Sequence, residues 1–162
     1  MPYRLFEPLH IGPKVLRNRT IRAAAFEGMA DSHRPTPQLV SYHREVAAGG
    51  IGMSTVAYAA VERSGLSFPH QLWLRKEIIP GLSELVQAIH SEGALASIQI
   101  GHCGNMAKRA VIGERPISPS GNFNLYGPNW PRAMDKTDIV RVVQSFGQAV
   151  GIAREAGFDA VE

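Results

Sequence analysis

The sequence predicts an α/β fold, namely the N-terminal half of a (β/α)8 TIM barrel with about four parallel strands and an N-terminal hairpin. Segments of strand and helix character alternate along the 162 residues, which favours a parallel sheet built from right-handed βαβ units. The returns from helix to strand are short glycine turns, whereas the long connections mostly follow strands. This asymmetry is typical of a barrel whose sites lie on the loops after its strands. A flavodoxin-like open sheet is the alternative.

The first fifty residues predict a hairpin, a strand and a helix. Gly12-Pro13 forms a turn between two short strand-like runs, and the first parallel strand is expected over about 20–25. Thr36 can cap the following helix, and Pro37 suits a first helical position. The residues expected on its buried face recur at helical spacing until Gly49-Gly50: Leu39, Val40, His43, Val46 and Ala47.

The middle of the chain predicts two more strands with a helix between them. Residues 51–60, IGMSTVAYAA, are nearly all apolar or small, as in parallel strands that are covered on both faces. The connection over 61–80 is long, which in a compact domain is often functional. A helix is expected over about 81–91, ended by Gly93, and residues 95–101, LASIQIG, form the third strand.

The last fifty residues predict a second excursion, a third helix and the start of a fourth strand. Residues 113–134 are rich in Pro, Gly, Asn and aromatic side chains. Asp135, with Asp138 in the first turn, opens the helix, Gly157 ends it, and the strand begins at 158. The helix is expected to bury one apolar stripe: Ile139, Val142, Val143, Phe146, Val150 and Ala153.

Composition limits the classes of function. A chain that is 44% hydrophobic and 19% charged is expected to fold rather than to be disordered. No apolar run approaches the ~18 residues of a membrane helix, and no signal pattern opens the chain. The single cysteine, Cys103, cannot form an internal disulfide and predicts a cytoplasmic location. The net charge of +3 is scattered, so neither nucleic acid nor membrane is expected as a partner.

Candidate site residues lie where the predicted strands end. The small residues Ala24, Ala25 and Ala59 let a flat ligand approach the backbone, although they equally suit the filling of a narrow barrel interior. Gln99 interrupts an apolar strand with one acceptor and two donors. Its amide either bonds to neighbouring backbone or pairs with a ring edge that presents both C=O and N–H, such as a flavin pyrimidine.

Three other residues lie at these strand ends, and two of them have two possible interpretations. Glu27 is either a base or polarity-tuning group beside a cofactor, or a carboxylate on the rim. His102 is either a group at the ligand mouth or a solvated loop histidine. Cys103 is expected to behave as a small apolar residue. Because no second Cys or His cluster accompanies it, no metal site is predicted.

Five motifs follow one another along the chain: LFEPLHIGPKVLRNRT, FEGM, AAGGIGM, QIGHCGN and EAGFDAVE. Together they resemble the Old Yellow Enzyme family of flavin-dependent ene-reductases, 2,4-dienoyl reductases and trimethylamine-dehydrogenase-like enzymes. The resemblance covers the whole chain but only about half of the family's barrel. Residues 1–162 are therefore expected to form one partial FMN-binding (β/α)8 domain.

The resemblance implies an FMN-dependent oxidoreductase of ene-reductase type. In this chemistry a hydride passes from NADH or NADPH to flavin N5, and from there to an activated alkene of enone type. His102 is the substrate-mouth candidate. No catalytic residue is assigned, because the family's substrate-binding histidine pair, or His and Asn, follows the position equivalent to Glu162. The implied cofactor-binding residues are Ala24, Ala25, Phe26, Glu27, Tyr58 and Gln99.

The chain departs from the family pattern at two points. Ala25-Phe26 stands where many members have Pro-Met, and Gly104-Asn105 where many have Gly-Arg, which removes a positive charge from the mouth. The family's phosphate pocket lies on later strands, so the isolated chain is expected to be incomplete or inactive. The alternative is a non-catalytic half-barrel that self-associates as a homo-oligomer or pairs with a complementing half-barrel, because its strand edges and apolar interior are open.

Overall fold

The computed structural model describes residues 4–125 and 127–162. Its main sheet has four parallel strands in sequential order: β3 (Ile21–Arg22), β4 (Met53–Ala60), β5 (Leu95–Gly101) and β8 (Ala160–Val161). Each new strand therefore lies beside the preceding one, as in a barrel. A flavodoxin-like sheet has the order 2-1-3-4-5 instead. The predicted half-barrel architecture is confirmed, and the open-sheet alternative is wrong.

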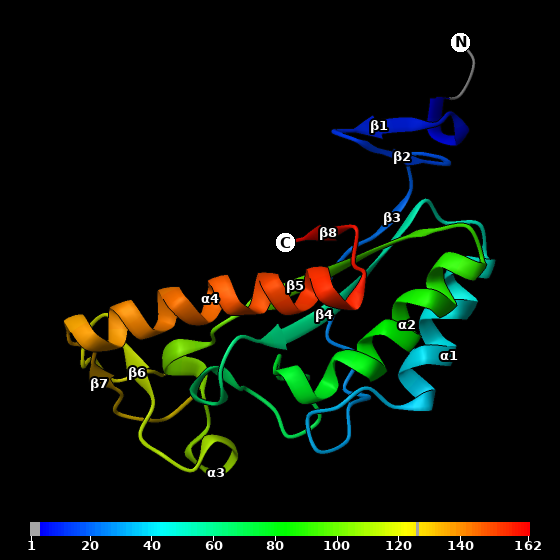
Figure 1. Cartoon of the computed structure of the whole chain (residues 1–162). Helices are drawn as coiled ribbons and strands as arrows, with labels where there is room; N and C mark the ends of the chain where they lie inside the picture. Colours follow the sequence, from blue (N-terminus) through cyan, green and yellow to red (C-terminus); the bar gives the residue numbers. More distant parts are fainter. Residues whose placement is uncertain (1–3, 126) are drawn as a thin grey trace.

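Three helices connect the strands and cover one face of the sheet. They are α1 (Pro37–Ala48), α2 (Ile79–Ser91) and α4 (Lys136–Ala156). Figure 1 shows α1 and α2 side by side, and α2 also contacts α4. Doubly wound sheets carry helices on both faces, so this one-sided cover is a second feature of a barrel. The core between helices and sheet includes Leu39, Val56, Leu82, Leu85, Ile89, Ile98, Ala149 and Ala153.

An antiparallel hairpin precedes the main sheet and is set apart from it in Figure 1. Its strands are β1 (Leu9–Ile11) and β2 (Lys14–Leu16), preceded by the short turn η1 (Arg4–Phe6). Lys14 Nζ lies 2.7 Å from Asp159 Oδ1, just before β8. Arg17 donates to the backbone carbonyls of Ala47 and Glu92, at the ends of α1 and α2. The hairpin therefore binds the end of the half-barrel where strands begin.

The two long excursions extend from the opposite end, after β4 and β5. The first contains η2 (Arg63–Gly65) and η3 (Lys76–Ile78). The second contains η4 (Gly104–Met106), α3 (Arg109–Ile112), β6 (Ile117–Ser118) and β7 (Arg132–Ala133), and it lies beside the N-terminal end of α4 (Figure 1). The carboxyl ends of the strands are thus surrounded by loops, as the sequence predicts.

The predicted helix starts agree with the structure better than the predicted bounds of the first strand do. Thr36 Oγ1 accepts the Leu39 N–H at 3.2 Å, which confirms the predicted cap. Asp135 and Asp138 form a capping box at the start of α4. β3 is shorter than the predicted 20–25, and the carbonyls of Ala23 and Ala25 after it accept hydrogen bonds from the Arg22 guanidinium. α2 begins at Ile79, two residues before the prediction.

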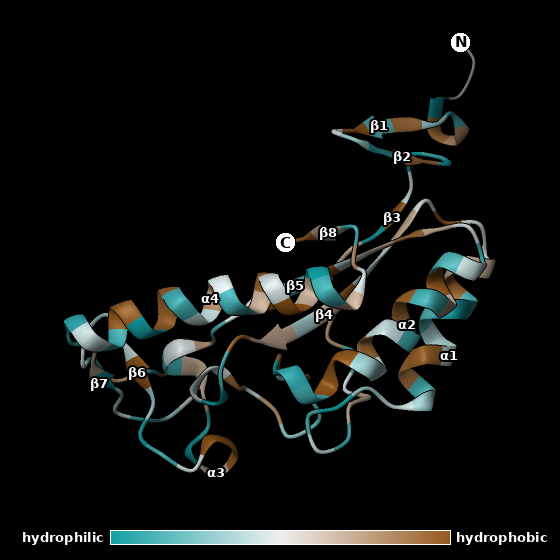
Figure 2. Cartoon of the chain, viewed as in Figure 1, coloured by the Kyte–Doolittle hydropathy of each residue, from teal (hydrophilic) through white to brown (hydrophobic). Residues whose placement is uncertain are grey.

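The predicted buried stripe of α4 is largely wrong. Ile139, Val143 and Val150 are 48%, 65% and 45% exposed, whereas Ala149 and the predicted Ala153 are buried. Apolar and polar residues alternate along the whole of α4 (Figure 2), so periodicity alone does not decide which side is covered. The side with small residues meets α2 and β5. Phe146 and Ile152 also pack against the core, whereas Ile139, Val143 and Val150 stay exposed.

Two further observations concern the part of the chain that the structure describes. None of its helices is long and apolar enough to span a membrane. Its His, Cys, Asp and Glu side chains form no group of three or more that could hold a metal ion.

Candidate functional site

An aromatic cluster lies where β3 and β4 end. Phe26 stacks on Phe68, with 4.6 Å between ring centroids, and its ring centroid lies 5.9 Å from that of Tyr58. The Tyr58 hydroxyl donates to Ser67 Oγ at 2.6 Å. Burial raises the pKa of the Tyr58 phenol, and the hydrogen bond with Ser67 only partly opposes this. Tyr58 is therefore a neutral phenol at physiological pH.

A cavity of about 490 Å³ opens beside this cluster, next to the ends of β4 and β5. Its lining includes Tyr58 and Phe68 of this cluster together with His102, Cys103 and Lys108. The structure thus brings together two residues that the sequence predicted, Tyr58 and His102. Ligand cavities in proteins commonly have a volume of this order and an apolar lining with a few polar groups.

Gln99 presents a hydrogen-bonding edge at the end of β5. Its side chain is half-buried, and its Nε2 donates to Glu162 Oε1 at 3.0 Å. The carboxamide oxygen accepts no hydrogen bond from the residues that the structure describes. One acceptor and one further N–H therefore remain available to a ligand. Gln99 lies on β5 and the segment 24–27 follows β3, and β4 separates these two strands in the sheet. Both predicted parts of the site therefore lie towards the carboxyl ends of the strands, but not on neighbouring strands.

The segment after β3 offers backbone groups at the same edge. Ala24 is half-buried and Ala25 is exposed. Within the described ranges, the backbone N–H groups of Ala25 and Phe26 have no hydrogen-bond partner. Ala59, in contrast, is fully buried in the core under the helices. Ala59 therefore fills the core between sheet and helices rather than the barrel interior, whereas Ala24 and Ala25 remain accessible.

Glu27 is an internal anchor. Its side chain is 4% exposed, so the interpretation as a rim carboxylate is wrong. Its Oε1 lies 3.0 Å from Arg22 Nη1 and 3.2 Å from His43 Nε2, and it accepts the Ala57 N–H at 3.1 Å. His43 Nδ1 in turn lies 2.8 Å from Ser54 Oγ. The carboxylate therefore ties the segment after β3 to α1 and β4 and faces these groups rather than an open site.

His102 lines the cavity, but both of its ring nitrogens have partners. Its side chain is 8% exposed, so the interpretation as a solvated loop histidine is wrong. The Gly104 N–H donates to Nδ1 at 3.1 Å, which leaves the ring proton on Nε2. Nε2 lies 3.2 Å from Glu62 Oε1 and donates to it. The imidazole is thus held in one orientation at the edge of the cavity.

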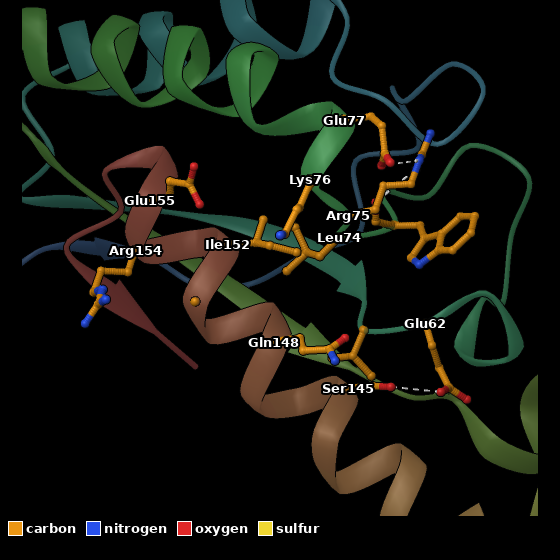
Figure 3. A pocket seen from close by; sticks show the side chains of 13 residues that line it. Glu62, Leu74, Arg75, Lys76, Glu77, Ser145, Gln148, Ile152, Arg154 and Glu155 are labelled. Atoms are coloured by element: carbon orange, nitrogen blue, oxygen red, sulfur yellow. Dashed lines mark hydrogen bonds and ion pairs between the residues drawn. The ribbon is translucent and has the colours of Figure 1, made fainter.

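Glu62, two residues after the end of β4, is a site residue that the sequence analysis missed. Burial alone would raise the pKa of its carboxyl, but hydrogen bonds from His102, Ser64, Arg141 and Ser145 outweigh burial and lower the pKa to about 2. The Ser145 hydroxyl donates to Oε2 at 3.0 Å (Figure 3). The available signal was a carboxylate just after the buried apolar run that ends at Val61.

A larger cavity, about 830 Å³, lies on the helix side of Glu62. Figure 3 shows Gln148 and Ile152 of α4 opposite the segment that carries Leu74 and Lys76. None of the residues that the sequence predicted for the site lines it. The smaller cavity, which contains Tyr58 and His102, is therefore the candidate site.

The chain matches the NADH:flavin oxidoreductase / NADH oxidase family over residues 4–162. It is 37% identical over 158 residues to the 4,4'-dithiodibutanoate disulfide reductase of Rhodococcus erythropolis, covering 98% of this chain and 39% of that protein. It is 36% identical over 151 residues to the NADH:acrylate oxidoreductase of Vibrio harveyi, covering 91% of this chain and 14% of that protein. The solved Old Yellow Enzyme homologue from Zymomonas mobilis matches with a TM-score of 0.89 and 25% identity, over 98% of this chain and 47% of that one. The chain spans less than half the length of these proteins.

Proposed function

This chain belongs to the NADH:flavin oxidoreductase / NADH oxidase family, and from that premise we propose that it forms one wall of an FMN site in an ene-reductase. The family agrees with the resemblance to Old Yellow Enzymes in the sequence motifs. The proposed reaction takes a hydride from NADH or NADPH and delivers it to a small activated alkene of enone type. Because the chain spans less than half the length of its relatives, the activity, substrates and partners of the whole protein are part of the proposal.

The observation that carries the proposal is the free edge of Gln99. A half-buried carboxamide with an unused oxygen and an unused N–H suits a planar ring that presents a donor beside an acceptor. The pyrimidine part of a flavin is such a ring. The unpaired backbone N–H groups of Ala25 and Phe26 lie at the same end of the sheet. The residues present therefore fit FMN.

The side chains of this half-barrel would then have distinct tasks. Bound FMN would accept a hydride from NADH or NADPH and deliver it to the acceptor. Gln99 and residues 24–26 would hold the ring system, and Tyr58 would form the wall between ring and cavity. Glu27 would act indirectly. Its carboxylate bonds to Arg22 and to the Ala57 N–H and so holds the segment 24–27 in place beside the cofactor.

His102 would shape the substrate mouth. Its two nitrogens bond to Gly104 and Glu62, so it contributes an oriented ring edge rather than a free acid or base. The 4,4'-dithiodibutanoate and acrylate in the names of two relatives are small carboxylates. Acceptors of that size suit a cavity of about 490 Å³.

The alternative function is a half-barrel that associates without catalysis, with a second copy or with a complementing half. The exposed apolar side chains of α4, Val143 and Val150 among them, favour it, because exposed apolar surface often marks an interface. The two functions are compatible, since two halves can form one site.

Titration of the protein with FMN tests the proposal. We expect saturable quenching of flavin fluorescence and, where a complementing half-barrel completes the site, anaerobic bleaching of the bound flavin by NADH or NADPH. Gln99→Leu should weaken FMN binding roughly tenfold, as expected when a buried hydrogen-bonding edge loses its partner. Gln87→Leu is the matched control, because Gln87 is exposed on α2. A folded protein that takes up no FMN, and forms colourless oligomers instead, would favour the alternative.

A further inference from the structure

Lys108 is the one side chain with a permanent charge that lines the candidate cavity among the described residues. It is exposed and has no carboxylate partner within the described part of the chain. Its Nζ lies 5.3 Å from the centre of the Phe68 ring, which holds the ammonium group at the cavity wall. Phe68 stacks on Phe26, so this wall continues to the segment proposed to contact the flavin.

The remaining polar groups that line the cavity supply no negative charge. Both ring nitrogens of His102 are engaged within the protein, Nδ1 by the Gly104 N–H and Nε2 by Glu62 and Ser64. Burial raises the pKa of the Cys103 thiol, although a hydrogen bond with Ser67 acts in the opposite direction. Tyr58 is likewise a neutral phenol. No negative charge among the described lining residues therefore competes for the ammonium group of Lys108.

The rest of the lining is suited to hydrocarbon. The rings of Phe68 and Tyr58 and the side chain of Met106 line the same cavity as Lys108. An apolar cavity with a single cation at its wall is complementary to a short carbon skeleton that ends in an anion.

We propose that this cavity selects acceptors that carry a carboxylate, with Lys108 as the counter-ion and Phe68 and Met106 around the carbon skeleton. This inference rests on the proposed function, because it names the class of acceptor for that same site. An uncharged acceptor of equal size would leave the ammonium group without a partner and would lose this selection.

The test compares crotonate with its uncharged analogue crotonamide. Dissociation constants for both are measured by NMR titration of the protein, with and without FMN. In Lys108→Met we expect the ratio of the crotonate to the crotonamide constant to rise roughly fivefold or more, the upper range for one partly exposed ion pair. In Lys108→Arg, which keeps the positive charge, the ratio should stay close to that of the parent protein. Lys136→Met, which removes an exposed lysine outside the cavity, should leave the ratio as in the parent protein.

The outcomes separate this inference from the proposed function. Suppose that FMN uptake is normal. If the ratio is then unchanged in Lys108→Met, or if crotonate does not bind saturably, the role of Lys108 is overturned and the flavin assignment is not affected. A ratio that responds to Lys108→Met in a protein that takes up no FMN overturns the flavin assignment and leaves the carboxylate site standing. A ratio that also changes in Lys136→Met overturns the inference, because a general effect of net charge then explains it.

Discussion

His102 Nε2 donates a hydrogen bond to Glu62 Oε1 across 3.2 Å and so joins the loop after β5 to the loop after β4. The same carboxylate accepts hydrogen bonds from Arg141 and Ser145 of α4. One buried charge therefore holds two loops of the candidate cavity against a helix. We expect the geometry of this wall to depend on the ionisation of Glu62.

Glu62→Gln should destabilise the protein in a pH-dependent way. The pKa of Glu62 is lowered from 4.5 to about 2 in the folded state, so its contribution to stability is complete above about pH 4.5 and is lost as pH falls towards 2. At pH 7 the variant should lose roughly 1–2 kcal/mol in the free energy of unfolding, measured by urea denaturation. The difference from the parent protein should shrink at pH 3.

Glu155→Gln is the control for this pH dependence, because Glu155 is exposed on α4 and makes no hydrogen bond or ion pair with the described residues. Its effect should stay within about 0.5 kcal/mol at every pH. A difference between Glu62→Gln and the parent that is as large at pH 3 as at pH 7 would contradict the role given to the ionised carboxylate.

Glu27→Gln should be more damaging than removal of a surface carboxylate. The substitution leaves Arg22 and His43 buried without their anionic partner, a situation that costs about 3 kcal/mol or more. Glu7→Gln is the matched control, because Glu7 also faces an arginine, Arg19, but at 3.9 Å and with 49% exposure of its side chain. It should cost less than about 1 kcal/mol. Equal effects in urea denaturation would show that Glu27 is not the anchor of the segment 24–27.

These internal anchors mark the limit of prediction from the sequence. Local signals were sufficient for the start of α1, because Thr36 and Pro37 act on the turn that they begin. The strand order followed from the alternation of elements and from their short glycine returns. The covered side of α4 could not be predicted, because apolar residues lie on several sides of this helix and tertiary contacts select the side with Ala149 and Ala153.

Positions in the candidate site were easier to predict than roles. Tyr58, Gln99 and His102 were selected because each lies near the end of a predicted strand, and the structure places them there, whereas their binding roles remain proposals. The roles of Glu27 and His102 depended on partners far away in sequence, His43 and Glu62, that no spacing pattern connects to them.

Asp135→Ala should weaken the start of α4. Asp135 Oδ1 accepts the Asp138 N–H at 2.8 Å, and Asp138 Oδ2 accepts the Asp135 N–H at 3.0 Å. Loss of this reciprocal cap should lower the free energy of unfolding by about 1 kcal/mol. Lys136→Ala, at the first helical position, is the control and should have a smaller effect. If both variants unfold at the same urea concentration as the parent, the capping box does not stabilise the helix.

The exposed side of α4 allows a test of association. Val143→Lys together with Val150→Lys should change the stability of the folded chain little, because both side chains are at least 45% exposed. If this side is an interface, the double variant should be mainly monomeric in light scattering at concentrations where the parent protein self-associates. A parent protein that is strictly monomeric over a wide range of concentration would rule out the self-associating alternative.

The central claim is that Gln99 bonds to the flavin ring, and the side-chain amide resonances of Gln99 test it most directly. In a protein labelled with nitrogen-15, these resonances are assigned by their absence from Gln99→Leu and followed during titration with FMN. We predict that they shift and saturate together with flavin binding, whereas those of Gln87 do not move. Saturable flavin binding that leaves the Gln99 amide resonances unchanged would contradict the account.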